Sequence, residues 1–528
     1  MSTYLNTRYY LFLTENNSSI GDFMSLKENK KVPVIILAIC LLALLCIGLS
    51  YAWWRYTAIQ DKTNVGISKC LKLELTNQSD EINLTNMYPI TDEEGRKLTP
   101  YTFTLTNTCT MSAEYTLNME MLEGTTLNSK YLAIMVNNGN INLLSSYDTA
   151  TTVIDGSTES RTIDTGILMP NGSKDYSISL WMDKSVTLSD DAQNKTFKSK
   201  VVVNAVATET TVDKIIASVD TTGKCPTVNE DGSVNVTGVE ATNGYLCKAP
   251  DAYGDSYYYR GNVTNNYVLF ADKYWRIVRI NGDGTVRVIY DGTSAHANGE
   301  SSSDRQIGTS VFNSSSNDNA YVGYMYGQTG ASTYAAAHAN TNNSTIKSYI
   351  DNWYKTNIVG TANEQYIADN IFCNDRSLAQ NNSGTGTGTS VTYYRWYNNP
   401  WPSGGYNSNM RLTCPQKNDA FTVSDTTNGN GALTYPVGLL STDEIVLAGG
   451  WNASNSGYYL YSGQYWWASS PGGFNGNGAI VRRVYSNGNA NDAYFVNDDI
   501  GVRPVFNLKA EVLAQGSGTV SDPYRISS

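Results

Sequence analysis

The chain has 528 residues, and because single hydrophobic cores stop growing at about 250 to 300 residues, we expect about two to four domains. Only 16% of the residues are charged and the net charge is −11, which excludes a nucleic-acid-binding protein, since that class needs a basic surface. The hydrophobic fraction of 41% excludes wholesale disorder. Few charges, many short polar residues and 38 tyrosines are typical of an all-β extracellular protein.

An uncharged apolar segment lies near the N-terminus, at residues 32–54. As a helix, its roughly 23 residues extend about 35 Å, which is enough to cross the hydrocarbon core of a bilayer. The sequence therefore predicts a transmembrane helix at 32–54. Three lysines precede it closely, namely Lys27, Lys30 and Lys31. The positive-inside rule then makes residues 1–31 a cytoplasmic tail and places the rest of the chain outside the cell.

The processing of this segment leaves alternatives open. Ser50-Tyr51-Ala52 has the small-x-small pattern of a signal-peptidase site, and cleavage after Ala52 would give a secreted protein. The apolar run is longer than a usual signal core, which favours an anchor that stays in place and a single-pass membrane protein. Met24 is an alternative start, which would shorten the cytoplasmic tail.

The number and distribution of the cysteines are consistent with export. Two of them, Cys40 and Cys46, lie in the apolar segment, and the others fall into local pairs. Six cysteines allow many pairings, and proximity in the sequence selects the disulfides Cys70–Cys109, Cys225–Cys247 and Cys373–Cys414. The chain has no CxxC motif, and its histidines lie far from the cysteine pairs, so we expect no metal site.

Residues 66–208 show the period-two pattern of half-buried strands. Apolar and polar residues alternate in short runs at 72–75, 101–105, 115–119 and 176–181, and the valine-rich run at 200–203 closes the set. Clusters of Asn, Gly, Ser and Asp separate these runs, and no helical pattern intervenes. The pattern predicts an all-β sandwich domain of the jelly-roll or immunoglobulin-like type, which would serve as a stalk.

Four motifs, one at 50–57 and three within 66–208, resemble camelysin and the biofilm-fibre proteins of Gram-positive bacteria: SYAWWRYT, YTFTLTNTCT, GSKDYSISLWMDKS and KTFKSKVVVNAV. The resemblance covers about 150 residues and implies an export segment followed by a jelly-roll sandwich. In that family the export segment is often cleaved, which favours the secreted alternative. Camelysin is described as a metalloprotease, but residues 66–208 contain no histidine, so this activity is not carried over.

A second domain is expected at 225–528, after a short amphipathic linker at 209–224. Its first strands are predicted at 274–280 and 285–290, and the hairpin signal Asn281-Gly282-Asp283-Gly284 joins them. A calcium loop is the alternative interpretation of this signal. It is set aside because the further carboxylates that such a loop needs do not follow at the required offsets.

Two helices are predicted in the second domain. Ser344 can cap a helix at 345–357, and the capping box Ser441-Thr442-Asp443-Glu444 begins another that Gly449-Gly450 ends. Residues 376–432 are rich in Asn, Gly, Ser and Thr and are expected to form surface loops. Because further strand patterns lie between residues 465 and 508, the domain is predicted to have an α+β fold.

This domain resembles a large set of surface proteins of Gram-positive gut bacteria through YYYRGNVTNNYVLFADKYWRIVRINGDGTVRVIYDG, IFCNDRSL, PVGLLSTDEIVLAGG, YWWASSP and GVRPVFNL. Its ending is also similar to the C-type-lectin-like fold of formylglycine-generating enzymes and of the variable proteins of diversity-generating retroelements. The resemblance implies a C-type-lectin-like ligand-binding domain. Cys373 and Cys414 are candidate counterparts of the enzyme cysteines, although a structural disulfide explains them equally well. In a variable protein, the asparagine codons near the 3′ end would be the diversified sites.

No residue pattern requires catalysis, so we expect the protein not to be an enzyme and to need no cofactor. A nucleophile would need His296 or His338 as its base, and both lie in Ala/Asn/Ser-rich stretches that predict solvated loops. Asp498 and Asp499 are adjacent, so in a strand they point to opposite faces and cannot flank one glycosidic bond.

The segment 466–499 is the predicted ligand-binding surface, because it interleaves aromatic residues with short amides and two arginines. Aromatic rings give contact area at low entropic cost, while short polar residues form adaptable hydrogen bonds. The candidate residues are Trp466, Trp467, Phe474, Asn475, Asn477, Arg482, Arg483, Tyr485, Asn487, Asn489, Asn491, Tyr494, Asn497 and Asp498. The alternative is that the tryptophans are core residues and the asparagines close hairpin turns.

The sequence thus favours an adhesin-like protein displayed on the cell surface. Its extracellular ligand, of unknown identity, would be a glycan or a protein, and the segment 32–54 would attach it to the membrane. Two alternatives stay open. One is a structural envelope or fibre-forming protein without a small ligand, and the other is an extracellular enzyme.

Overall fold

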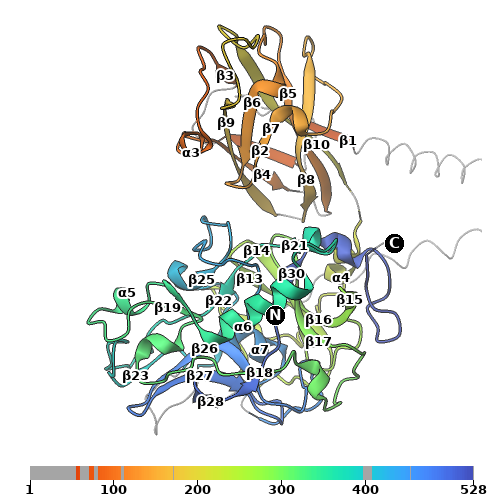
Figure 1. Ribbon diagram of the computed structural model, residues 1–528. Helices are drawn as coiled ribbons and strands as arrows, with labels where there is room; N and C mark the ends of the chain where they lie inside the picture. Colours follow the sequence, from red (N-terminus) through yellow and green to blue (C-terminus); the bar gives the residue numbers. More distant parts are fainter. Residues whose placement is uncertain are drawn as a thin grey trace, which may run out of the picture. The chain divides into compact units, whose positions relative to one another are not determined.

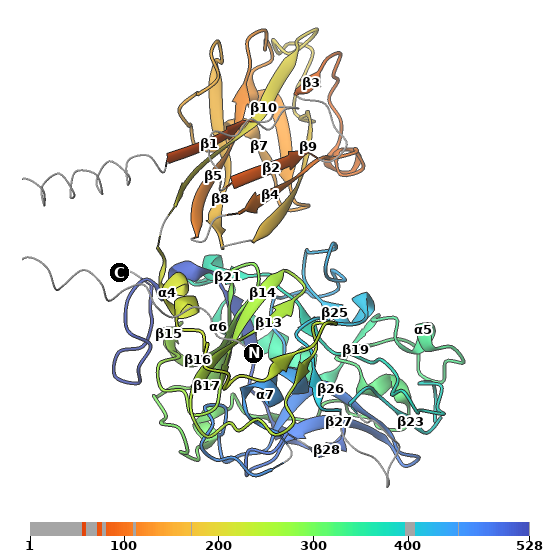
Figure 2. The same ribbon diagram turned by 180° about the vertical axis from the view of Figure 1, so that it is seen from behind.

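The computed structural model describes residues 55–59, 71–75, 81–108, 112–169, 172–207, 209–396, 407–451, 453–490 and 492–526. The described chain is mainly β-structure, with short helices between the strands (Figures 1 and 2). The strands up to residue 207 form a sandwich, and those that follow form other sheets. We call these the sandwich and the C-terminal part.

The sandwich has two layers among the described residues. One sheet has the strand order β1-β10-β5-β8, with β3 paired to β10, and the other has the order β2-β4-β9-β6-β7. The strands of the first sheet are β1 (Arg55–Ile59), β3 (Ile82–Leu84), β5 (Ala113–Met121), β8 (Glu159–Leu168) and β10 (Phe197–Ala207). Those of the second sheet are β2 (Leu71–Leu75), β4 (Tyr101–Asn107), β6 (Leu132–Val136), β7 (Ile141–Leu143) and β9 (Ser173–Met182).

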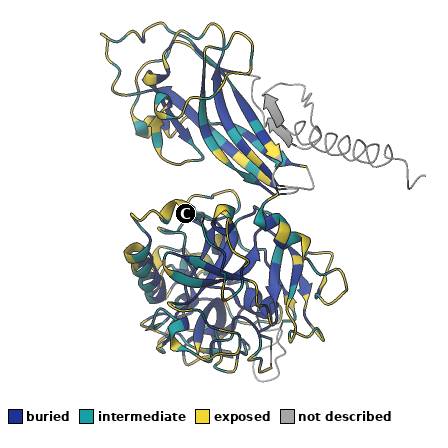
Figure 3. Ribbon diagram, turned by 90° about the vertical axis from the view of Figure 1, so that its right-hand side faces the viewer, coloured by how far each residue is buried: buried dark blue, intermediate teal, exposed yellow. Residues whose placement is uncertain are grey.

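The alternation in the sequence places one face of each strand in the core between the two sheets. Along β4, Tyr101, Phe103 and Leu105 are buried, while the threonines between them remain half-buried. Phe103 stacks on Tyr176, its register partner on β9, with the ring centroids 5.0 Å apart. Figure 3 shows this mixture of buried and exposed positions along the strands. The predicted β-sandwich is therefore confirmed.

The C-terminal part contains two larger sheets among its described residues. One has the order β13-β14-β16-β17-β30-β21, with β15 on β16, and the other has the order β18-β29-β26-β27-β28, with β23 on β26. The first is built from β13 (Tyr245–Asp251), β14 (Gly254–Arg260), β15 (Tyr267–Phe270), β16 (Lys273–Ile280), β17 (Val286–Gly292), β21 (Ile367–Ala368) and β30 (Val505–Leu508). The second is built from β18 (Thr309–Ser310), β23 (Thr392–Tyr393), β26 (Trp466–Phe474), β27 (Ala479–Val484), β28 (Asp492–Phe495) and β29 (Ile500–Gly501).

Shorter ladders complete the β-structure that the C-terminal part shows. One joins β11 (Thr227–Val228), β12 (Val234–Asn235) and β24 (Asn409–Met410). The others pair β19 (Met325–Tyr326) with β20 (Asn342–Asn343) and β22 (Phe372–Cys373) with β25 (Ala420–Phe421). These ladders tie the long loops of this part to one another.

The strands β16 and β17 form the predicted hairpin. The Asn281 N–H donates to the Thr285 carbonyl, and the Gly284 N–H donates to the Asn281 carbonyl. Gly284 has a φ of 85°, which glycine adopts without strain. The small residues between the two β-branched runs therefore close a turn, as the sequence predicts.

Both predicted helices are present. The helix α6 (Thr345–Asn357) begins at Ser344, whose hydroxyl accepts the N–H of Lys347. The helix α7 (Thr442–Ala448) begins with a reciprocal capping box between Ser441 and Glu444. It ends at Gly449, which has a φ of 124°.

The predicted linker contains a short helix, α4 (Thr211–Ala217), and α5 (Tyr334–Ala337) is a single turn. Thr210 and Asp213 form a capping box at the start of α4. Val212 and Ile215 are buried in the hydrophobic core of the C-terminal part. The segment 209–217 is thus packed on that core through its small apolar face.

The predicted fold class needs correction. The described chain is mostly β-sheet, and its few helices are short, because the Asn-, Gly- and Ser-rich stretches form loops and two-residue ladders; the α+β prediction is wrong in this respect. Within the described ranges, no helix combines the length and the apolar character needed to cross a membrane. The structure therefore does not support the predicted transmembrane helix, and the segment 32–54 itself lies outside the described residues.

Two of the predicted disulfides are confirmed. Cys225 is bonded to Cys247 and Cys373 to Cys414, with the Cα atoms 5.5 Å apart in each pair. The predicted pair Cys70–Cys109 lies outside the described residues. Disulfides are typical of proteins that fold in an oxidising compartment, which is compatible with an extracellular location.

Candidate ligand-binding surface

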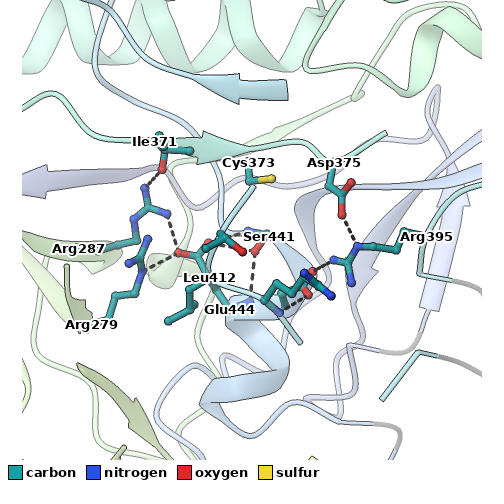
Figure 4. Close-up of a pocket in the computed structure, with 12 residues that line it drawn as sticks. Arg279, Arg287, Ile371, Cys373, Asp375, Arg395, Leu412, Ser441 and Glu444 are labelled. Carbon is teal, nitrogen blue, oxygen red and sulfur yellow. Dashed lines mark hydrogen bonds and ion pairs between the residues drawn. The ribbon is translucent and has the colours of Figure 1, made fainter. Parts of the chain in front are cut away.

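A small pocket of the C-terminal part is lined by arginines and carboxylates (Figure 4). Glu444, on the first turn of α7, accepts from Arg287 at 2.6 Å and from Arg279 at 3.3 Å. Arg279 also donates to Asp251 at 2.6 Å. Burial raises the pKa of Glu444, but the two arginines lower it by more, so its pKa is below the usual range. Glu444 is therefore a buried carboxylate held in its charged form.

A second set of salt bridges closes the other side of this pocket. Arg395 pairs with both Asp375 and Asp443, and the Arg411 N–H donates to Asp443 at 2.9 Å. The space left in the pocket is only about 10 Å³, which holds about one water molecule. Because its charges are paired with one another and the space is nearly filled, we assign the pocket to the structural core.

A second buried charge cluster surrounds Asp291, at the end of β17. The Oδ1 atom of Asp291 accepts from Arg305 at 2.7 Å and from Arg503 at 2.8 Å. The Nη1 atom of Arg276 lies 3.9 Å from Oδ2, and all four side chains are fully buried. One carboxylate thus faces three guanidinium groups inside the core. No local sequence pattern predicts this cluster.

The two histidines are not solvated loop residues, so that prediction is wrong. His338 is 1% exposed and packs against Tyr334 with the ring centroids 4.0 Å apart. Burial, reinforced by the nearby Arg376, lowers the pKa of His338 to about 3, so its ring is neutral at pH 7. His296 is 5% exposed. His338 also lies near the ring of Tyr394, 56 residues away, a contact that the local composition does not reveal.

Several residues of the predicted binding surface lie in the core, which corrects the prediction for them. They are Trp466, Trp467, Phe474 and Arg482. All nine residues of β26 are buried, because both faces of this strand are covered. Trp467 donates to the Ser310 carbonyl and meets Phe312 edge to face, whereas Arg503 lies over the ring of Trp466.

The amide residues of the prediction are spread over different turns. Asn475, Asn477, Asn487 and Asn497 are exposed, Asn489 and Asp498 are half-buried, and Asn491 lies outside the described residues. The side chain of Asn475 accepts the N–H groups of Asn477 and Gly478, and that of Asn487 accepts the N–H of Asn489. For Asn475 and Asn487, turn closure is therefore the role that the structure supports.

Three other residues of the prediction, Arg483, Tyr485 and Tyr494, meet Tyr465 in one cluster, which we call the tyrosine surface. The three tyrosines are 37%, 38% and 41% exposed in chain order. The guanidinium carbon of Arg483 lies 4.7, 5.6 and 3.9 Å from the ring centroids of Tyr465, Tyr485 and Tyr494. Each of these distances is within the range of a cation–π contact.

Backbone hydrogen bonds hold the residues of the tyrosine surface in position. Arg483 lies on β27 and Tyr494 on β28, which pair antiparallel beside β26 (Figure 1). Tyr485 follows β27 in a tight turn, with its N–H donating to the Asn489 carbonyl. The carbonyl of Tyr465 accepts from Gly501 and from the side chain of Gln306.

Tyr465 was not among the predicted site residues. It directly precedes Trp466, and consecutive residues of an extended segment point to opposite sides. Trp466 points into the core, whereas Tyr465 faces outward and is 37% exposed. This alternation, applied to the YWW run, is the signal that identifies it.

Neither family models, nor curated proteins, nor solved structures give a match to this chain. The C-type-lectin-like assignment therefore gains no support from known folds. The chemistry of the described residues alone bears on the function.

Proposed function

We propose that this chain is an extracellular ligand-binding protein and that the tyrosine surface contacts its ligand, a glycan or another protein. One observation carries the proposal: three tyrosines, each more than one third exposed, surround a single arginine on paired strands. Tyrosine and arginine are among the residue types that contribute most to binding energy at interfaces.

The rigidity of the surface supports a binding role. Each tyrosine has only two rotatable side-chain bonds, so little conformational entropy is lost when a ligand covers it. The T-shaped contact between Tyr465 and Tyr485, with centroids 4.7 Å apart, restricts these rings before any ligand arrives. Preorganised contacts of this kind raise affinity because less ordering accompanies binding.

The extracellular setting is supported by the covalent chemistry of the C-terminal part. Cys225–Cys247 and Cys373–Cys414 are disulfides, which persist in oxidising compartments and are rare in reducing ones. An extracellular binding protein would meet glycans and proteins of other cells, and aromatic rings flanked by hydrogen-bonding groups suit both ligand classes.

Replacing Tyr485 and Tyr494 together by alanine is expected to abolish detectable binding in a screen against glycan and protein arrays. A hot-spot tyrosine contributes about 2 kcal/mol or more, so the loss per residue is about 30-fold. Folding should persist, because both side chains are exposed.

Tyr88→Ala is the matched control, since Tyr88 is 72% exposed and lies in the sandwich. Its array profile should equal that of the wild-type protein. Wild-type binding by the Tyr485→Ala, Tyr494→Ala protein would refute the site. If the wild-type protein binds no array component but assembles into fibres, the structural alternative gains support over this proposal.

A further inference from the structure

Hydrogen bonds of His296 hold the loop that follows β17 closed. The ring of His296 lies between two carboxylates of the same loop, with Nδ1 2.7 Å from Glu300 and Nε2 2.8 Å from Asp304. The backbone is anchored as well, because the Tyr267 hydroxyl donates to the His296 carbonyl at 2.8 Å. Both ring nitrogens are therefore used in the closed loop.

This geometry fits only one protonation state of the ring. A protonated imidazole donates from both nitrogens, whereas a neutral one donates from one and presents a lone pair at the other. In the neutral state, one of the two carboxylates would face that lone pair at hydrogen-bonding distance, which is repulsive. The closed loop is thus the structure of protonated His296.

The charges around the ring favour protonation. Burial lowers the pKa of His296, but the hydrogen bonds to Asp304 and Glu300 outweigh it, so the pKa is raised above the ordinary value. Asp291, on the neighbouring β17, acts in the same direction. The cations facing this loop bind its other atoms: Arg305 donates to the Glu300 carbonyl and Arg276 to the side chain of Asn298.

The same loop also contacts the segment that leads into β26 and contains Tyr465. The Ser302 N–H donates to the Ser462 carbonyl at 3.0 Å, and the Gln306 side chain donates to the Tyr465 carbonyl at 3.0 Å. Gly463 packs tightly here, since a Cβ atom on it would lie 1.9 Å from Oγ of Ser301. Residues 301–306 therefore form one side of the support beneath Tyr465.

We propose that protonation of His296 closes the loop at 293–306 and holds Tyr465 in its place, so that the tyrosine surface binds its ligand more tightly in acid than at alkaline pH. This inference rests on the proposed function, because it assigns a regulation to the same surface. The loop is the bistable element, and its two states differ by one proton.

The two carboxylates differ in how firmly they are held. Asp304 also accepts from the N–H groups of Thr293 and Ser294, whereas Glu300 accepts from the N–H of Ala297 and its side chain is 45% exposed. Glu300 is therefore the carboxylate that moves away from the ring when His296 loses its proton. Because the folded pKa lies above the unfolded value of about 6.5, closure is complete below that pH and is lost as the pH rises through the folded pKa.

The test is a pH titration of the full chain with two readouts that need no ligand. The chain has only two histidines, and His338 stays neutral above pH 5, so an NMR signal from isotope-labelled histidine that titrates in this range reports His296. Amide hydrogen exchange is followed in peptides covering 297–306 and 462–466. Because exchange is itself base-catalysed, the readout is the protection factor, which we expect to fall about tenfold in both segments as His296 deprotonates, the effect of losing one charge-assisted hydrogen bond.

Two variants serve as controls. His296→Gln removes the titration, so its exchange, compared at each pH with that of the wild-type protein, should lose the transition. Glu300→Gln changes a half-exposed side chain and should lower the His296 midpoint without unfolding the protein. A wild-type midpoint below about 6.5, or a pH-independent protection factor at 462–466 while 297–306 opens, would overturn the inference.

Binding is then measured at pH 5.5 and 8.5 against an immobilised component retained on the array, with His296→Gln alongside. The expected result is at least a severalfold weaker affinity at pH 8.5 for the wild-type protein alone. If the exchange transition occurs but affinity does not follow it, the coupling to the tyrosine surface is wrong. Failure of the proposed function itself has a different signature, namely unchanged binding by the Tyr485→Ala, Tyr494→Ala protein.

Discussion

Asp291→Asn is expected to lower the free energy of unfolding of the C-terminal part by about 3 to 5 kcal/mol. The substitution keeps the shape of the side chain and removes its charge, so three fully buried guanidinium groups lose their carboxylate. An uncompensated buried charge is far more costly than the loss of an exposed ion pair. Denaturant titration followed by tryptophan fluorescence measures the change.

Asp255→Asn provides the matched control for this measurement. Asp255 pairs with Lys248 at 2.7 Å, but both side chains are nearly half exposed, so the expected loss is below about 1 kcal/mol. Equal unfolding midpoints for the Asp291→Asn and Asp255→Asn proteins would show that the buried cluster does not stabilise the fold through its charge.

Glu444→Ala is expected to have a comparable effect, again about 3 to 5 kcal/mol. The change leaves Arg279 and Arg287 without their shared carboxylate and also removes the capping box with Ser441 at the start of α7. Loss of a helix cap alone costs about 0.5 to 2 kcal/mol. The same denaturant titration detects the combined loss.

Glu444→Gln separates the two contributions, because glutamine can still form a capping box but carries no charge. We expect the free energy of unfolding of the Glu444→Gln protein to lie between those of the wild-type protein and the Glu444→Ala protein. Since the folded pKa of Glu444 is lowered, its stabilisation is present above the unfolded value of about 4.3 and is lost as the pH falls through the folded pKa. Wild-type stability of the Glu444→Gln protein at pH 7 would rule out a role for the charge.

Features with a local cause could be predicted from the sequence. The helices α6 and α7 begin where a capping serine is followed by a helical pattern, and the two described disulfides join neighbouring cysteines. The alternation along β4 likewise predicts which residues enter the sandwich core. In each case, residues close in sequence determine the outcome.

The failed predictions have nonlocal causes. Nothing near Asp291 in the sequence indicates that Arg503, 212 residues away, reaches it. The run Trp466–Phe474 contains Ser, Pro and Gly, which suggest a surface strand, yet segments from other parts of the chain cover both of its faces. The ligand-binding prediction therefore moves from the tryptophans to the tyrosines: Tyr465 and Tyr485 lie at the ends of β26 and β27, and Tyr494 lies on β28.

Hydroxyl-radical footprinting with and without a component retained on the array tests the central claim most directly. We predict that Tyr465, Tyr485 and Tyr494 lose labelling when the component is bound, while the exposed Tyr88 is labelled equally in both states. If the three tyrosines keep their labelling while residues elsewhere are protected, the tyrosine surface is not the binding site.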